Sequence, residues 1–143
     1  MKCMKISLAL ALAVVGTTAA TATATAAGKS NPGVLNGVYR VTWTEKQLIA
    51  AGTSQRYAHG NHGVLTWTLR DGSFQLRWQV PPLCHGTYVV SGATVSIKQG
   101  PGCSGLFRAS WSLRNGQLRL SVTRATDPGD RVLFGGKAWK KIG

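Results

Sequence analysis

Acidic residues are scarce in this sequence. Its 143 residues include 17 lysines and arginines but only four aspartates and glutamates, which gives a formal charge of +13 at pH 7. The four carboxylates are Glu45, Asp71, Asp127 and Asp130. Acid-base catalysis and oxygen-rich metal sites both draw on carboxylates, and four are too few to supply such a site and also balance the surface charge. The composition therefore indicates a non-catalytic protein that uses no cofactor.

The sequence also lacks the short motifs of common active sites. It has no GxSxG elbow, no HExxH zinc motif and no GxxxxGK[ST] phosphate loop. Residues 100–105 (GPGCSG) satisfy GxGxxG, but residues 106–111 alternate as in a strand, whereas a dinucleotide site needs a helix there. We interpret these glycines as a turn between strands.

No hydrophobic run is long enough to cross a membrane. The apolar stretch at residues 6–16 has eleven residues, follows a basic start and precedes the small residues 17–27. This order predicts a secretory signal peptide at residues 1–27; the alternative is an uncleaved anchor, which needs roughly 20 apolar residues. Residues 28–34 are then a short linker, and residues 35–143 form a domain outside the cell or at the cell wall. Losing Lys2 and Lys5 with the leader lowers the charge from +13 to +11.

Cysteine is rare as well. Of three cysteines, Cys3 lies in the predicted leader, which leaves Cys84 and Cys103. A pair of cysteines in an oxidising compartment predicts a disulfide, and closing a loop of about 20 residues stabilises a fold by about 3 kcal/mol. Two free thiols, or a metal site that includes His85, are the alternatives.

Strand-like alternation is what the sequence has in abundance. Apolar and polar residues alternate along several short segments, and Asp71-Gly72, Ser91-Gly92 and Asn115-Gly116 separate some of them as hairpin turns do. The segments expected to be strands are residues 38–44, 64–70, 74–80, 87–90, 94–98, 106–113, 118–123 and a last one that ends at 142.

A single helix is expected among these strands. Thr44 to Gln47 fits a capping box before Leu48–Ala51, and Gly52 supplies a stop. About eight short strands with one apolar face each must close or stack to hide those faces. The sequence therefore predicts an all-β protein, an eight-stranded antiparallel up-and-down barrel with one short helix after the first strand.

Several motifs in a fixed order support a family resemblance. They are Leu35–Tyr39, Ala50–Gly52, Cys84–Tyr88, Trp111–Leu113, Asp127–Asp130, and Phe134 with Ala138–Ile142. In this order the chain resembles the lipocalin-like (calycin) barrels, and more closely the small secreted proteins of that type from high-GC Gram-positive bacteria. True lipocalins carry Gly-x-Trp where this chain has Gly37-Val38-Tyr39. The resemblance implies a barrel with a binding cavity and transfers no reaction.

Aromatic residues on the apolar faces of the strands suggest a ligand site. The candidates are Tyr39, Trp43, Trp67, Trp78 and Trp111. If they line a cavity, the barrel binds a small apolar or aromatic ligand. If they fill the barrel, they are core residues only, and both interpretations remain open at this point.

Arginines on the opposite faces suggest a second, different partner. The candidates are Arg40, Arg70, Arg77, Arg108 and Arg119. With so few acids, such a surface attracts polyanions of the cell envelope, while no motif for sequence-specific nucleic-acid recognition is present. We expect a monomer in either case.

Three histidines are the remaining candidates for chemistry. His59 and His62 are expected in one loop, and His85 follows Cys84. Three imidazoles suffice for a zinc site with an open position, but no predicted element fixes this pair and no carboxylate is near. We interpret them as solvated side chains without metal.

Overall fold

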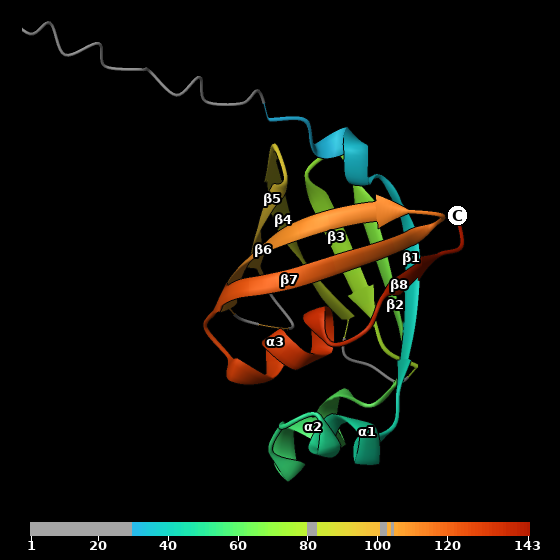
Figure 1. Ribbon diagram of the computed structural model, residues 1–143, viewed down its shortest axis with the longest axis vertical. Helices are drawn as coiled ribbons and strands as arrows, with labels where there is room; N and C mark the ends of the chain where they lie inside the picture. The colour runs from blue at the N-terminus through green and yellow to red at the C-terminus, as the bar shows by residue number, and fades with distance from the viewer. Residues whose placement is uncertain (1–29, 80–82, 101–102, 104) are drawn as a thin grey trace, which may run out of the picture.

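The protein is a closed antiparallel barrel of eight strands, in which each strand pairs with the next and the last pairs with the first. The computed structural model describes residues 30–79, 83–100, 103 and 105–143 (Figure 1). The prediction of an antiparallel barrel of about eight strands is confirmed, whereas the predicted signal peptide lies outside the described residues. The strands are β1 (Gly37–Trp43), β2 (Gly63–Arg70), β3 (Ser73–Arg77), β4 (Leu83–Ser91), β5 (Thr94–Gln99), β6 (Gly105–Arg114), β7 (Gln117–Ala125) and β8 (Trp139–Lys141).

Alternating burial shows why these segments are strands. Phe74 and Leu76 of β3 are buried while their neighbours are exposed, so one face of the strand enters the core and the other meets solvent. Two hairpins turn at residues with left-handed backbone, Asp71 (φ 46°) with Gly72 (φ 88°) and Asn115 (φ 51°) with Gly116 (φ 68°). Positive φ at both central residues is what the tightest hairpin turn requires, and Asx-Gly pairs adopt it at low cost.

The prediction of a single helix is wrong. The described chain has a 3-10 helix and three α-helices, namely η1 (Pro32–Leu35), α1 (Glu45–Ala50), α2 (Gln55–Asn61) and α3 (Pro128–Gly135). Thr44 caps α1 through the reciprocal bonds of a capping box with Gln47, at 3.1 Å each. Helices α2 and α3 were not predicted, yet Ser54 and Asp127 each accept a backbone hydrogen bond as their N-caps. The barrel therefore carries two α-helices that the sequence prediction did not include.

Helix α3 closes one end of the barrel. Its Phe134 ring lies 4.6 Å from the ring of Phe107, 5.3 Å from Trp67 and 5.8 Å from Trp139, centroid to centroid. The indoles of Trp43 and Trp139 donate to the carbonyls of Leu133 and Phe134 at 3.3 and 3.1 Å. The last turn of a helix has carbonyls without partners inside the helix, and here two core indoles satisfy them. The helix is thus fixed to the barrel by both packing and hydrogen bonds.

A disulfide fastens the barrel at another point. Cys84 of β4 is bonded to Cys103, with the two Cα atoms 5.3 Å apart, so the predicted pairing is confirmed. The bond ties β4 to the connection between β5 and β6. Among the described helices none is long and apolar enough to span a membrane.

Candidate anion-binding surface

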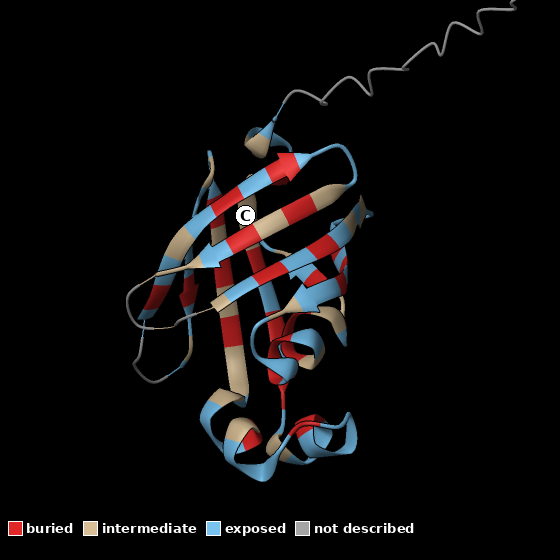
Figure 2. Ribbon diagram, turned by 90° about the vertical axis from the view of Figure 1, so that its left-hand side faces the viewer, coloured by how far each residue is buried: buried red, intermediate tan, exposed pale blue. Residues whose placement is uncertain are grey.

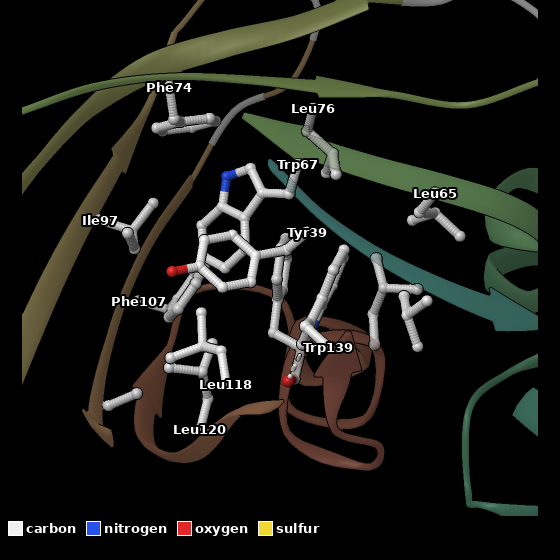
Figure 3. Packing of buried hydrophobic residues seen from close by; sticks show 14 of the residues in the cluster. Tyr39, Leu65, Trp67, Phe74, Leu76, Ile97, Phe107, Leu118, Leu120 and Trp139 are labelled. Carbon is white, nitrogen blue, oxygen red and sulfur yellow. Dashed lines mark hydrogen bonds between the residues drawn. The ribbon is translucent and has the colours of Figure 1, made fainter. Parts of the chain in front are cut away.

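The five aromatic candidates do not together line a single cavity in the barrel. Tyr39, Trp43 and Trp67 are 0%, 4% and 1% exposed, whereas Trp78 and Trp111 are half-buried. Trp78 lies beyond the end of β3, although it was expected inside that strand. The side chains drawn in Figure 3 fill the space between the strands, with Trp67 and Tyr39 at the centre. The three buried aromatics are therefore core residues packed against other protein side chains.

The polar atoms of these core aromatics are mostly bonded within the protein. Tyr39 donates its hydroxyl to the Leu35 carbonyl at 3.0 Å, and burial raises the pKa of that hydroxyl. Trp67 Nε1 has no hydrogen-bond partner among the described residues. Its ring meets Phe74 edge-on at 84° and 6.1 Å, and Figure 3 shows the nitrogen on the side that faces Phe74. This buried N–H therefore stands without a polar partner in the described part of the aromatic core.

The five arginine candidates all lie on the outside of the barrel. Arg40, Arg70, Arg77, Arg108 and Arg119 are exposed, as is every other arginine of the described chain. Burial alternates along the strands in Figure 2, so exposed residues recur on the face opposite the core. The structure thus distributes the arginines over the exterior, where a soluble partner can reach them.

The strand register adds a cation that the sequence prediction did not include. Arg40 of β1 lies directly opposite Lys140 of β8 on one side and Thr66 on the other, and Thr66 pairs with Arg77. Like charges placed opposite each other on a sheet repel, which destabilises the pair unless an anion lies between them. Lys140 was not among the predicted candidates, because its neighbours depend on the register of the closing strand.

The four carboxylates are all engaged away from these cations. Asp71 accepts from Asn36 at 2.7 Å, Asp127 caps α3, and Glu45 lies 3.6 Å from His59. Asp130 is buried and accepts from Tyr57 at 2.8 Å and Gln99 at 3.4 Å. Within the described ranges no lysine or arginine forms an ion pair with a carboxylate. The positive charge of the exterior is therefore not neutralised locally.

Burial shifts the pKa of groups that lie next to α3. It raises the pKa of the Asp130 carboxyl above its ordinary value, although the hydrogen bonds from Tyr57 and Gln99 act in the opposite direction. Burial and the neighbouring Asp130 raise the pKa of the Tyr57 hydroxyl. Burial also lowers the pKa of Lys137, whose ammonium donates to Thr42 O and Gln47 Oε1 at 2.8 Å each. The hydrogen bonds of these three groups join α3 to α2 and β5, and join Lys137 to β1 and α1.

A groove of about 620 Å³ is lined by residues of β6, β7 and the helix α3. Its wall carries Ser110 and Ser112 on β6, and Arg119 and Ser121 on β7. Arg131 of α3 lines the groove as well, and it was not predicted because α3 was not recognised. Lys137 and Trp111 also belong to the lining, and no acidic residue does.

Two further grooves differ in chemistry. The one of about 500 Å³ over β5, β6 and β7 contains Arg108 and Arg124, which lie directly opposite each other beside a break in the strand register. The one of about 900 Å³ over β2, β3 and β4 contains Arg70 and His85 but also Asp71. The groove beside α3 and the groove over β5, β6 and β7 are therefore lined by arginines without any acidic residue.

The histidines are placed differently from the prediction. His59 lies within α2 and His62 is its C-cap residue, so the pair is not in an irregular loop. His62 Nδ1 contacts the carbonyl of His59 at 2.9 Å, and the two rings lie 6.0 Å apart. His85 is exposed on β4. Where the structure describes the chain, no three residues among histidine, cysteine, aspartate and glutamate are grouped as a metal site requires.

Comparison of the chain with protein-family models, with curated proteins and with solved structures finds no match in any of the three.

Proposed function

We propose that this protein is a secreted, non-catalytic, lipocalin-like up-and-down barrel that binds polyanions, such as those of the cell envelope, through its arginine-bearing exterior. One observation carries the proposal. Every arginine of the described chain is exposed, and none of them forms an ion pair with the four carboxylates, which are engaged elsewhere.

Unpaired arginines are well suited to this role. A guanidinium group presents five N–H donors in a planar fork that fits carboxylate, sulfate and phosphate groups, and it stays charged at any physiological pH. The formal charge of +13, or +11 without the predicted leader, adds a long-range field that draws anionic polymers toward the surface. Both effects favour polyanions without requiring a particular base sequence or fold in the partner.

Secretion is supported by the leader-like sequence of residues 1–27 and by the disulfide, which persists in oxidising compartments. A small apolar ligand inside the barrel has less support. Tyr39, Trp43 and Trp67 are packed against other core side chains, and α3 occupies one end of the barrel. We therefore place the binding function on the outside and propose that the chain acts as a monomer.

Co-sedimentation with purified anionic cell walls at increasing salt concentration tests the proposal. We expect retention at low ionic strength and progressive release as salt shortens the screening length from about 30 Å at 0.01 M to about 8 Å at 0.15 M. A neutral insoluble polysaccharide serves as the control and should retain little protein. No retention at low salt, or retention that salt does not change, would contradict an electrostatic mechanism.

A further inference from the structure

Free hydroxyl groups distinguish the groove beside α3 from the groove over β5, β6 and β7. Ser110 lies directly opposite Ser121, and Ser112 lies directly opposite Arg119. All three serines are exposed, and none of their hydroxyls bonds to another described residue. Side chains that face each other across two paired strands are about 5 Å apart. Residues i and i+2 of one strand, which share a face, are about 7 Å apart. The four groups thus form a polar patch of about the size of one sugar ring.

The groove over β5, β6 and β7 offers a comparison. There Ser96 Oγ accepts from Arg108 Nε at 3.3 Å, and Thr126 Oγ1 bonds to the backbone of Leu106 at 3.2 Å. Leu106 itself is 55% exposed beside them. The hydroxyls of that groove are already used, so it presents arginines and apolar surface but fewer free donors and acceptors.

Two unengaged guanidinium groups line the same groove as the serines. Arg119 and Arg131 line the groove, and neither donates a hydrogen bond to another described residue. Arg131 is carried by α3, which Trp43 and Trp139 fix to the barrel, so its backbone position is set by the core. Lys137 adds positive charge at the same groove, although its ammonium is held by Thr42 and Gln47. An anion entering the groove therefore meets two free guanidinium groups.

We propose that this groove binds an acidic sugar unit, in which Arg119 and Arg131 hold the anionic group while Ser110, Ser112 and Ser121 bond to the sugar hydroxyls. The proposal rests on the polyanion-binding function and names the substrate class for it. A serine hydroxyl both donates and accepts, as a sugar hydroxyl does, so the two match each other. The groove volume of about 620 Å³ lies in the range of small-molecule sites. A polyanion without sugar hydroxyls, such as polyphosphate, is expected to interact with the arginines but to gain nothing from matching the serine hydroxyls to sugar hydroxyls.

Titration of the chain without residues 1–27 against two probes tests this assignment. The probes are an oligogalacturonate, which is an acidic saccharide, and inorganic polyphosphate, which carries charge but no sugar. Arg119→Ala is compared with Arg124→Ala, because both residues are exposed on β7 and each change removes one positive charge. The double variant Ser110→Ala with Ser121→Ala removes hydroxyls without changing the charge.

The expected results differ between the probes. Arg119→Ala should weaken oligogalacturonate binding about tenfold or more, since it removes charge-assisted hydrogen bonds, and Arg124→Ala should weaken it by less than about fivefold. The serine variant should weaken oligogalacturonate binding about fivefold or more and leave polyphosphate binding unchanged. Arg119→Lys keeps the positive charge but loses the planar pair of N–H donors. Compared with Arg119→Ala, it should restore polyphosphate binding more fully than oligogalacturonate binding.

Two outcomes separate failure of this inference from failure of the proposed function. Equal losses in Arg119→Ala and Arg124→Ala for both probes, with no effect of the serine variant, would show diffuse electrostatic binding and overturn the sugar site alone. No binding of either probe at low salt would overturn the proposed function together with the site. Thermal unfolding of each variant verifies that the barrel is intact.

Discussion

The interior and the outer surface of this barrel treat their polar groups in opposite ways. Inside, the hydroxyl of Tyr39 and the indoles of Trp43 and Trp139 each donate to a nearby carbonyl. Outside, Arg40 and Lys140 lie opposite each other, and neither has a carboxylate partner. The contrast shows that the chain supplies most hydrogen bonds of its core aromatics, with Trp67 Nε1 as an exception, whereas the cations of the exterior remain available to a partner.

The largest expected effect belongs to the interior. Replacing Phe134 with alanine removes the ring that joins α3 to Trp67, Phe107 and Trp139, and should lower the free energy of unfolding by about 3–5 kcal/mol. Urea unfolding followed by tryptophan fluorescence measures the loss. The exposed Leu106→Ala is the matched control, with an expected change of about 0.5 kcal/mol or less. Equal losses in the two variants would mean that α3 does not contribute to the core.

An intermediate effect concerns the one buried carboxylate. Burial raises the pKa of Asp130 above its ordinary value of 3.8, so the folded protein binds this proton more tightly than the unfolded chain does. The ionised form is therefore disfavoured in the fold above the raised pKa, and the unfolding free energy should increase as the pH falls through that pKa toward 3.8.

Unfolding by urea at a series of pH values, in the wild type and in Asp130→Asn, measures this dependence. The asparagine variant has no proton to bind at this position and should lack that rise on acidification. If wild type and variant show the same pH dependence, Asp130 does not titrate in the expected direction.

The smallest expected effect concerns the exterior, where stability and binding should change in opposite directions. Arg40→Glu places a carboxylate opposite Lys140 and should raise the unfolding free energy by about 0.2–1 kcal/mol. The same change should weaken retention on anionic cell walls, because it removes one positive charge and adds a negative one. Arg40→Gln is the control for the loss of the arginine alone. A variant that is less stable than wild type would show that the cations on this face do not repel each other.

The interior was easier to predict from the sequence than the helices were. Alternation along β3 identifies Phe74 and Leu76 as inward residues, because a strand has a period of two that shows even in five residues. Helix α2 buries only Ala58, and α3 contains Gly129 and Gly135, so neither shows a clear helical period over its short length. Asp127 and Pro128 are the N-cap and the first residue of α3, a pair typical of helix starts that the sequence prediction did not use.

The candidate site was predictable only in part. An arginine on the polar face of a strand can be assigned to the exterior from alternation alone, and all five of those residues are exposed. Which of them are neighbours depends on strand register, which no local pattern encodes for the pairing of β1 with β8. Arg131 joins Arg119 at the groove only through the placement of α3, and the core contacts of Phe134 decide that placement. Long-range packing therefore assembles the groove.

The pairing of β1 with β8 also has a consequence for how the chain folds. Arg40 and Lys140 are partners across the closing seam, and about 100 residues separate them in the sequence. Closing so large a loop costs chain entropy before any contact compensates for it, and folds dominated by such distant pairings form slowly. Until β8 arrives, β1 presents an open edge with unpaired backbone groups. Folding of this barrel is thus expected to end with the closure of its first strand by its last.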